Sequence, residues 1–323
     1  MTLLRVILPL LLLCAAGPAL AYPVAVAACN DAVRFDHAPL RPVVNDSNMV
    51  QTVIDMGLTS RFVGFGSVKR PLDMNILKGP PAALGWVKAH QIADRYPSTE
   101  QVLGANPDFY FAGWNFGLGA QTGVTPEALG QFGVKTYVLN ESCIRIGKRA
   151  PVSMETMYAD VRALGRIFNV EPRAEAMIAG FKTRVAVVTA RTSKAKTRPK
   201  VMYCGTCDSD GPVLVIGAEG MPAALITLAG GTNLYPEIAD SYVRVGWETV
   251  IARDPDWILL APSGIPADQA IRYLTTAPAL KNLTAVKKRQ FIVMTYPERS
   301  PSTRNVEALE RLARTIHPEL FKP

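Results

Sequence analysis

The strongest constraint on this sequence is a pattern that occurs twice. Residues 100–108 begin with glutamate, end in Asn-Pro-Asp and lead into the apolar run at residues 109–112. Residues 248–256 begin with glutamate, end in Asp-Pro-Asp and lead into the apolar run at residues 257–260. Each copy predicts a short helix, a turn at the Pro-Asp pair and then a buried strand. The turn is expected because the residue before a proline disfavours helical backbone.

A second repeated pattern lies upstream of each copy. Residues 49–57 and 221–230 are both apolar at helical spacing and end at a glycine, which is typical of a helix C-terminus. Strand-like runs precede them at residues 42–44 and 200–203. Strands therefore alternate with helices in both halves of the chain, which indicates βαβ units and parallel sheets.

A long helical stretch separates the two halves. Residues 152–168 form one amphipathic pattern with Ser153 as the expected N-cap, and residues 173–194 continue with apolar side chains at helical spacing. The second segment is rich in alanine and free of internal proline, so it predicts a stiff helix and not a flexible linker. The expected fold is α/β: two Rossmann-like lobes with parallel sheets joined by a single long rigid α-helix. The expected domains are 22–150, 151–196 and 197–323.

The N-terminus predicts export. Residues 1–21 contain Arg5, an apolar run and a final Ala-Leu-Ala, which is the layout of a secretory signal peptide. Val-Ala-Ala-Cys at residues 26–29 resembles a lipoprotein cleavage box, so a lipid anchor at Cys29 is the less favoured alternative.

Composition narrows the function classes. The hydrophobic share of 49% excludes a disordered chain, and only the N-terminus is continuously apolar, which excludes a polytopic membrane protein. The formal net charge of +8 is spread along the chain, so nucleic-acid binding is not expected.

The cysteines predict two disulfides. Cys14 leaves with the signal peptide, and four remain: Cys29, Cys143, Cys204 and Cys207. An even number in an oxidising compartment favours two pairs. The Cys204-Gly-Thr-Cys207 motif is compatible with a redox-active pair, but turn residues follow it where a thioredoxin-like motif would open a helix. A structural pair is favoured there, which leaves Cys29 to pair with Cys143.

At this point the sequence resembles a known family, the ABC-importer substrate-binding proteins of the helical-backbone class. These proteins capture ferric siderophores, cobalamin and related chelates. The matching pieces, whose order and spacing are more specific than any one of them, are the two Glu–Pro-Asp units and residues 35–44, 56–64, 164–168, 228–233 and 285–289. Cys29 and Cys143 also fall where one branch of the family keeps a cysteine pair.

The resemblance implies a periplasmic, monomeric, non-enzymatic protein. Its partners would be a small-molecule chelate and an inner-membrane ABC permease dimer with its ATPase, and it would carry no cofactor of its own. In this family one surface glutamate on each lobe docks onto permease arginines, and Glu100 and Glu248 occupy these places. The alternative is that each glutamate is a helix-start residue favoured by the helix dipole. The repetition favours docking.

The ligand is expected in a cleft between the lobes, at the carboxyl ends of the strands. The candidates follow strands or precede the Glu248 helix, and Glu-Arg-Ser-Pro at residues 298–301 resembles a stretch whose arginine reaches the ligand in cobalamin binders. They are the segment at residues 45–48, which includes Ser47 and Asn48, and Ser67–Arg70, Trp114, Asn115, Tyr242, Arg244, Trp247, Tyr296 and Arg299, with Arg145 as a further cation. Trp114, Trp247 and Arg299 are preferred. The alternative for each aromatic residue is a place in the core.

Several ligands and functions remain open. A ferric siderophore is favoured, with cobalamin or another corrinoid and heme as alternatives. A signalling receptor with the same fold and an exported Cys204/Cys207 thiol–disulfide oxidoreductase are more distant alternatives. A bare-metal site is not expected, since the chain has only His37, His90 and His317. No motif indicates a catalytic nucleophile or a phosphate loop.

Overall fold

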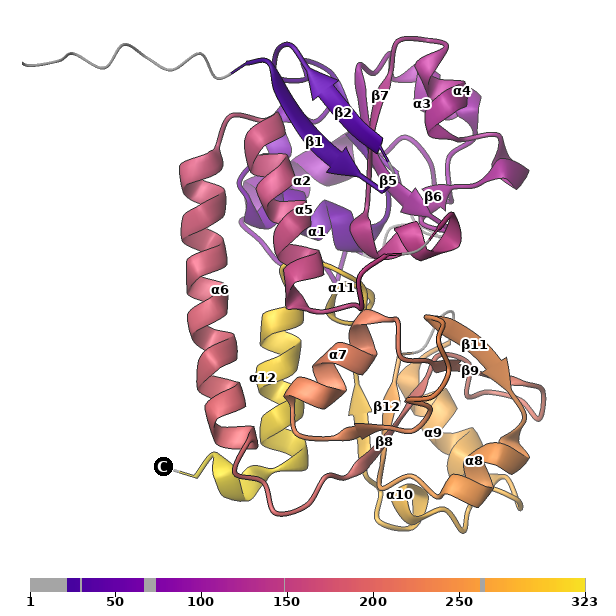
Figure 1. The fold of residues 1–323 in the computed structure, drawn as a ribbon. Coiled ribbons are helices and arrows are strands. Elements are labelled where there is room, and N and C mark those ends of the chain that lie inside the picture. Colours follow the sequence, from indigo (N-terminus) through magenta and orange to yellow (C-terminus); the bar gives the residue numbers. More distant parts are fainter. Residues whose placement is uncertain (1–21, 30, 67–73, 148, 262–264, 323) are drawn as a thin grey trace, which may run out of the picture.

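The computed structural model describes residues 22–29, 31–66, 74–147, 149–261 and 265–322 (Figure 1). The predicted signal peptide and the Ser67–Arg70 segment lie outside these residues. Figure 1 shows two lobes, one above the other, each built around a sheet. We call the elements from β1 to η3 the first lobe and those from β8 onward the second lobe.

The first lobe is built on a parallel sheet of order β4-β3-β5-β6, in which β7 also pairs with β5. Because helices and loops cover both of its faces, β3 and most of β5 are continuously buried and apolar, as expected for a parallel sheet. The strands predicted at residues 42–44 and 109–112 are confirmed. The strands are β3 (Pro42–Val44), β4 (Gly64–Phe65), β5 (Phe109–Trp114), β6 (Gly117–Leu118) and β7 (Lys135–Val138).

The second lobe repeats this arrangement with a parallel sheet of order β10-β8-β12-β13. Its strands are β8 (Lys200–Cys204), β10 (Thr232–Asn233), β12 (Trp257–Leu260) and β13 (Phe291–Val293). An antiparallel pair, β9 (Val213–Ile216) with β11 (Tyr242–Val245), lies beside it. The duplicated pattern of the sequence therefore corresponds to two similar sheets.

The aspartate of each Pro-Asp turn has the same role in both lobes. Asp108 accepts hydrogen bonds from the backbone N–H groups of Leu40 and Arg41, at 2.6 and 2.9 Å, just before β3. Asp256 accepts one from the N–H of Lys200, at 2.7 Å, at the start of β8. Asp108 thus connects the start of β5 to the start of its neighbour β3, and Asp256 connects β12 to β8 in the same way. This shared role gives a physical reason for the repeat.

Helices surround the two sheets. The first lobe has α1 (Ser47–Asp55), η1 (Thr59–Arg61), α2 (Pro81–Ala89), α3 (Thr99–Gly104), η2 (Ala120–Thr122), α4 (Pro126–Gly130) and η3 (Asn140–Arg145), besides the hairpin of β1 (Val24–Ala28) and β2 (Asp31–Phe35). The second has α7 (Met221–Leu228), α8 (Trp247–Arg253), α9 (Ala267–Thr276), α10 (Thr284–Lys287), α11 (Tyr296–Arg299), α12 (Asn305–Ile316) and η4 (Pro318–Leu320). In the described part of the chain, no helix combines the length and the apolar character that a bilayer crossing requires.

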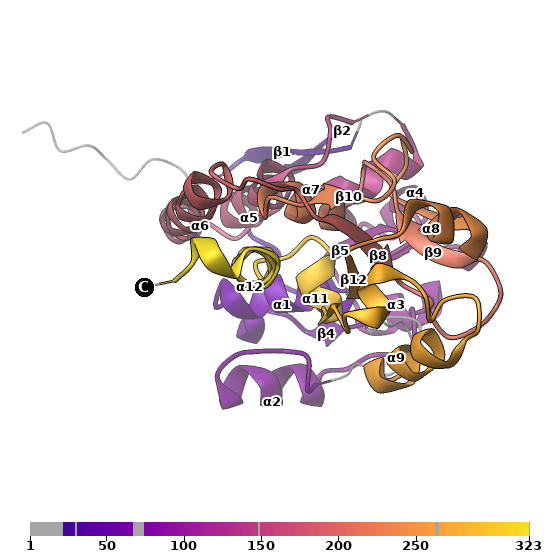
Figure 2. The same cartoon turned by 90° about the horizontal axis from the view of Figure 1, so that it is seen from below.

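The predicted connecting helix is confirmed. After α5 (Met154–Ile167), the helix α6 (Glu171–Thr192) runs along one side of both lobes, and Figure 2, seen from below, keeps α5 and α12 next to it. Arg184 of α6 forms a two-pronged ion pair with Glu310 of α12, at 2.8 and 2.7 Å. The chain therefore passes between the lobes through a helix that packs on both of them. Its predicted stiffness stays a prediction.

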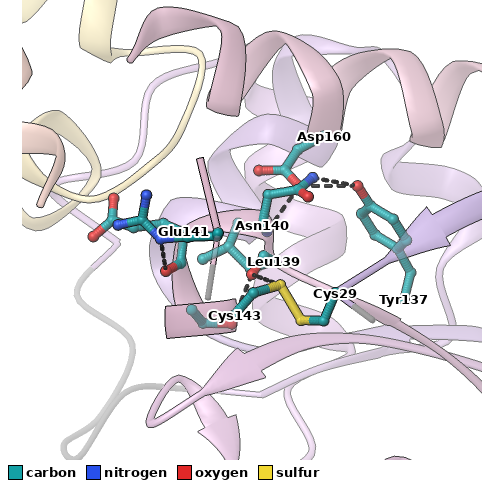
Figure 3. Close-up of a disulfide and its surroundings, with 9 residues drawn as sticks. Cys29, Tyr137, Leu139, Asn140, Glu141, Cys143 and Asp160 are labelled. Carbon is teal, nitrogen blue, oxygen red and sulfur yellow. Dashed lines mark hydrogen bonds between the residues drawn. A yellow bond between two sulfur atoms is a disulfide. The ribbon is translucent and has the colours of Figure 1, made fainter. Parts of the chain in front are cut away.

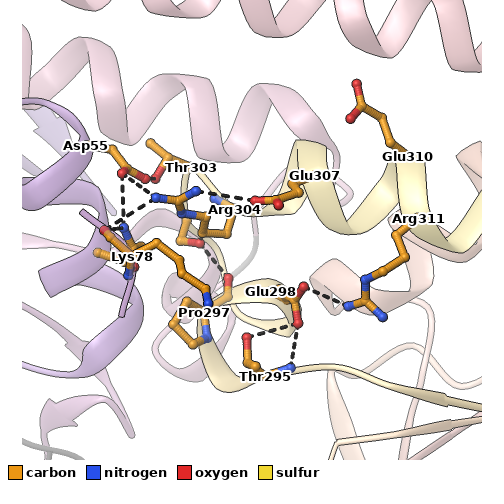
Figure 4. A network of polar contacts seen from close by, with 12 residues as sticks. Asp55, Lys78, Thr295, Pro297, Glu298, Thr303, Arg304, Glu307, Glu310 and Arg311 are labelled. Carbon is orange, nitrogen blue, oxygen red and sulfur yellow. Dashed lines mark hydrogen bonds and ion pairs between the residues drawn. The ribbon is translucent and has the colours of Figure 1, made fainter. Parts of the chain in front are cut away.

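Direct polar contacts also join the two lobes (Figure 4). Asp55, at the end of α1, accepts hydrogen bonds from Arg304 at 2.7 Å and from the hydroxyl of Thr303 at 2.5 Å. Nearby, the Asn48 side chain donates to the carbonyl of Pro301 at 2.9 Å. These contacts hold α1 of the first lobe against the segment between α11 and α12 of the second.

Candidate functional site

Aromatic, acidic and basic side chains meet where the carboxyl ends of the two sheets face each other. Asp46 follows β3, and Tyr296 is the first residue of α11, which follows β13. The Tyr296 hydroxyl donates to Oδ2 of Asp46 at 2.9 Å, a bond that joins the two lobes directly. We call the following residues the cleft cluster: Asp46, Tyr96, Tyr203, Tyr242, Tyr296 and Arg299.

Asp46 is the fully buried acid of the cleft cluster. Its φ of 74° is unusual for a residue other than glycine, and its Oδ1 accepts from the N–H of Ser47 at 2.8 Å. The Tyr96 hydroxyl lies 3.1 Å from Oδ2 of Asp46 and 2.9 Å from the carbonyl oxygen of Asn115. Burial raises the pKa of Asp46 to about 6, although the hydrogen bonds from Tyr296 and Tyr96 act against this rise.

Arg299 is the buried cation of the cleft cluster, with only 6% of its surface exposed. Its guanidinium lies 4.3 Å from the centroid of the Tyr296 ring, which is a cation–π contact. Tyr203 of β8 and Tyr242 of β11 pack edge to face, with ring centroids 5.7 Å apart. Burial raises the pKa of both hydroxyls, and the positive charge of Arg299 opposes this rise.

Polar atoms without partners accumulate around the cleft cluster. Among the described residues, these buried atoms have no hydrogen-bond partner: Asn45 Oδ1, Ser47 Oγ, Asn48 Oδ1 and Ser300 Oγ. Most buried polar atoms in folded proteins are satisfied, because leaving one unpaired costs free energy. Their gathering where strands of both lobes end indicates groups that a bound molecule would contact.

Other predicted ligand residues lie next to this cluster. Ser47 and Asn48 are buried in the first turn of α1, directly after Asp46. Trp114 ends β5 and is half-buried, and its indole N–H is buried without a partner among the described residues. Asn115 is exposed, and its carbonyl connects to the cluster through Tyr96. These placements are compatible with the predicted roles, which stay predictions.

Three further predicted residues lie outside the cleft cluster. Trp247 is only 8% exposed, packs in the core of the second lobe, and donates its indole N–H to the carbonyl of Ser209 at 3.0 Å. Its ring packs in the protein core, as the core alternative expects, and its ligand-binding role stays a prediction. Arg244 is exposed on β11 and donates to the carbonyl of Pro212 at 2.9 Å. Arg145 pairs with Asp240 at 3.1 Å and forms an interlobe contact.

Two members of the cleft cluster, Tyr96 and Tyr203, were not among the predicted site residues. Asp46 belongs to the predicted segment at residues 45–48, directly after a predicted strand and before a predicted helix, a position typical of an N-cap. Tyr203 lies in β8, and the apolar pattern of this strand predicts burial but does not show that its hydroxyl belongs to a binding site. Tyr96 lies in a loop, and no local pattern marks it.

A second polar centre of the first lobe lies beside the Cys29–Cys143 disulfide (Figure 3). Glu141 of η3 is buried, and its Oε2 accepts from the N–H of Met221, at the start of α7 in the other lobe, at 3.2 Å. Asp160 of α5 accepts from the hydroxyl of Tyr137 at 2.9 Å and from the side chain of Asn140 at 2.7 Å. Burial raises the pKa of Glu141 to about 8 and that of Asp160 to about 7.

These raised pKa values predict how stability depends on pH. Between about pH 4.5 and about pH 8 the folded chain holds a proton on Glu141 that the unfolded chain has lost. The free energy of unfolding should therefore fall as the pH rises through this window, by about 1.4 kcal/mol per pH unit for each such group. Urea unfolding at pH 5, 6, 7 and 8 measures the slope.

The variant Glu141→Gln isolates the contribution of Glu141. The amide oxygen of the glutamine can still accept the hydrogen bond from Met221, but the side chain does not titrate. The slope of the free energy of unfolding against pH should therefore become less steep by about 1.4 kcal/mol per pH unit, the contribution of one proton. The exposed Glu127→Gln is the matched control and should keep the wild-type slope. Equal slopes for all three proteins would contradict the assignment.

The two predicted docking glutamates are exposed. Glu100 lies in the first turn of α3 and Glu248 in the first turn of α8. Figure 1 shows α3 and α8 on the same side of the molecule, one on each lobe and opposite α6. A hydrogen bond with Ser98 lowers the pKa of Glu100, so this carboxylate is charged at neutral pH.

Both predicted cysteine pairs are disulfides in the structure. Cys29 is bonded to Cys143, and Cys204 to Cys207. Cys204 and Cys207 are buried in the second lobe, and no helix opens between them and β9. This environment differs from the accessible site of a redox-active pair and favours a structural role. A thioether-linked lipid would need the same Cys29 sulfur, so the disulfide and a lipid anchor exclude each other.

Metal-ligating side chains do not converge in the described ranges: no group of three or more His, Cys, Asp or Glu residues there could hold a metal ion. His317, one of the three histidines, is buried and contacts the carbonyl of Gly230 at 3.1 Å, at the end of α7. In this position the His317 side chain can donate a hydrogen bond to a backbone carbonyl group left unpaired at the end of a helix.

Comparison with known proteins gives a consistent result. A family model described as periplasmic binding protein matches residues 43–297. A vitamin B12-binding protein of Vibrio parahaemolyticus is 23% identical over 184 residues, which are 57% of this chain and 60% of that protein. The chain thus matches less than two thirds of the length of this curated relative.

Solved structures share the fold over nearly the whole chain. A structure described as an ABC-type Fe3+-hydroxamate transport system from Saccharomonospora viridis has a TM-score of 0.76 at 23% identity and covers 91% of this chain and 99% of its own. A periplasmic binding protein from Veillonella parvula has a TM-score of 0.76 at 24% identity, with 91% and 97% covered. A periplasmic heme-binding protein from Pseudomonas aeruginosa has a TM-score of 0.68 at 21% identity, with 87% and 93% covered.

Proposed function

The chain belongs to the periplasmic binding protein family, and from this premise we propose that it captures a metal chelate between its two lobes and delivers it to an ABC permease in the inner membrane. A ferric siderophore is the favoured ligand, and heme and cobalamin are the alternatives. Related proteins are named for Fe3+-hydroxamate, heme and vitamin B12, so each of these chelates is a reasonable candidate.

The observation that carries this proposal is the cleft cluster with the unpartnered atoms around it. Arg299 is buried. A guanidinium stays protonated, and its planar fork matches carboxylate and similar anionic groups with two parallel hydrogen bonds. Tyr203 and Tyr242 lie beside Arg299, and their hydroxyls interact with its guanidinium. Aromatic walls around one buried cation suit a bulky, partly anionic molecule.

Binding must change the contact between the lobes. The bond from Tyr296 to Asp46 joins the two lobes at the place where we put the chelate. We expect the ligand to separate this pair and to supply new partners for both groups. The lobes would then move relative to each other while α6 keeps its contacts with both, so a change of lobe orientation is the signal that the permease reads.

A ligand panel tests the proposed function. The purified protein is titrated with a ferric hydroxamate, a ferric catecholate, heme and cyanocobalamin, and binding is followed by tryptophan fluorescence and by calorimetry. Trp114, half-buried next to the cluster, should report occupancy. We expect one chelate to bind with a stoichiometry of one per chain. If the folded protein binds none of the four, the proposed function is wrong.

The docking role of the two exposed glutamates gives a separate prediction. Two charges far apart on one side of the molecule suit a two-point contact with arginines of a dimeric permease. The double variant Glu100→Ala/Glu248→Ala should lower the uptake rate of the chelate by at least about tenfold and leave the affinity of the isolated protein within about twofold. Transport into reconstituted vesicles and ligand titration measure the two quantities.

The matched control is Glu171→Ala/Glu319→Ala, which removes two exposed glutamates from α6 and η4. It should leave both uptake and affinity unchanged, since exposed ion pairs contribute little to stability. If the control lowers uptake as strongly as the test variant, net charge explains the effect and the docking role fails.

A further inference from the structure

A cavity of about 650 Å³ lies between the connecting helices and the second lobe, apart from the cleft cluster. Its walls come from the start of α5, the middle of α6, the helix α7 and the segments around Ala218 and Asn233. Figure 1 shows α5, α6 and α7 around the place where the two lobes meet. No residue of the cleft cluster lines the cavity, so it is distinct from the proposed chelate site.

The walls of the cavity are mainly apolar and carry no net charge. Val185 and Ala186 of α6 line it, as do Ala224 and Leu228 of α7. Among the lining residues only Glu155 and Lys182 are charged, and they pair with each other at 2.9 Å with roughly half or more of each side chain exposed. The cavity therefore suits an apolar, uncharged molecule, and its volume is in the ordinary range for small-molecule sites, about 300–1,000 Å³.

Two buried polar atoms make the cavity more than an apolar groove. Tyr158 of α5 is 2% exposed and Asn233 of β10 is 5% exposed, and both line the cavity. The Tyr158 hydroxyl and Oδ1 of Asn233 have no hydrogen-bond partner among the described residues. One is a hydroxyl that can donate, and the other is an amide oxygen that can accept.

The neighbours of both groups hold them in place. The Asn233 amide nitrogen donates to the carbonyls of Ile216 and Gly217, each at 3.2 Å, which fixes Oδ1 as the free atom. The Tyr158 ring is stacked on Phe181 of α6, with centroids 6.4 Å apart. Burial raises the pKa of the Tyr158 hydroxyl to about 12, so it carries its proton at neutral pH.

We propose that this cavity is a second binding site, for a neutral amphiphile with an apolar body and a hydroxyl or amide head. The body would fill the groove between α6 and α7, and the head would accept a hydrogen bond from Tyr158 and donate one to Asn233. The site does not depend on the proposed chelate function, since the two share no residue.

The probe N-phenyl-1-naphthylamine tests the apolar part of this proposal. It is neutral, carries one N–H donor, and its fluorescence rises in apolar surroundings. The full chain should bind one molecule saturably. Ala186→Trp, which places an indole in the groove from an exposed helix position, should weaken binding by at least about tenfold, or about 1.4 kcal/mol.

Ala179→Trp is the matched control, because it adds the same indole to an exposed position of α6 that does not line the cavity. It should bind the probe within about twofold of the wild type. Absence of saturable binding by the wild type, or equal binding by Ala186→Trp, overturns the site. Neither result bears on chelate binding, which is measured with the ligand panel.

The hydrogen-bonding part is tested by competition with 1-decanol. Tyr158→Phe keeps the ring and removes only the hydroxyl, so it should weaken displacement of the probe by 1-decanol about fivefold, as expected for one lost hydrogen bond. Its affinity for the probe itself should change less. If 1-decanol competes equally well in both proteins, Tyr158 does not bind the head group and the proposed chemistry is wrong.

Discussion

Replacing Cys29 and Cys143 together with alanine should lower the free energy of unfolding by roughly 4 to 5 kcal/mol. The two cysteines are 114 residues apart, so their bond closes most of the first lobe into one loop. In the chain-entropy account, the cost of leaving a loop of this length open in the unfolded state is about this large. It is comparable to the lower end of the total stability of a domain, about 5 kcal/mol. Urea unfolding of the oxidised proteins measures the difference.

The second disulfide supplies the matched control. Cys204 and Cys207 are only three residues apart, so the same account gives a loss of about 1 to 2 kcal/mol for Cys204→Ala/Cys207→Ala. Both variants remove two partly or fully buried sulfurs, so packing losses are similar and the difference reports loop length. If the two double variants lose equal stability, loop closure is not the reason for the effect.

The first disulfide also bears on the site. Cys143 lies in η3 next to Glu141, which reaches the start of α7 in the other lobe. Opening the bond would free η3 from the β1–β2 hairpin and loosen one of the contacts between the lobes. We therefore expect the Cys29→Ala/Cys143→Ala variant to show a weaker pH dependence of stability than the wild type, because Glu141 would be less buried.

The fold could be predicted from the sequence because its strongest signals are local and occur twice. The Pro-Asp turns are confirmed. Their aspartates also have a role that the sequence spacing does not show, because Asp108 and Asp256 accept hydrogen bonds from the backbone at the starts of β3 and β8. The glycines that end α1 and α7 are also confirmed: Gly57 and Gly230 have φ of 66° and 86°, a region that other residues rarely adopt.

The site was harder to predict, because side chains far apart in the sequence meet there. The rule that ligands bind at the carboxyl ends of strands directed attention to Tyr296 and Arg299, whose side chains contact each other in the structure, and their ligand-binding role stays a prediction. It could not show that the Trp247 ring turns inward, since that depends on the packing of the segment around Ser209. Tyr96 reaches Asp46 from a loop 50 residues away, and no periodic pattern encodes such a contact.

The contrast between two predicted arginines provides the sharpest test of the cleft. Arg299→Gln should weaken binding of an anionic chelate by at least about a hundredfold, because a buried charged hydrogen bond contributes about 3 kcal/mol and the variant leaves no cation between Tyr203 and Tyr242. Arg244→Gln removes an exposed arginine of the same lobe and should change affinity by less than about threefold. Tryptophan quenching by the bound chelate measures both.

A third variant separates charge from shape at this position. Arg299→Lys keeps the positive charge but loses the planar, forked guanidinium and its stacking on Tyr296, so its affinity should lie between those of Arg299→Gln and the wild type. Thermal unfolding shows whether each variant is folded, since Arg299 is buried. If folded Arg299→Gln binds the chelate as tightly as the wild type, or if Arg244→Gln has the larger effect, the ligand does not contact the cleft cluster. The exposed surface around β11 would then be the place to look for it.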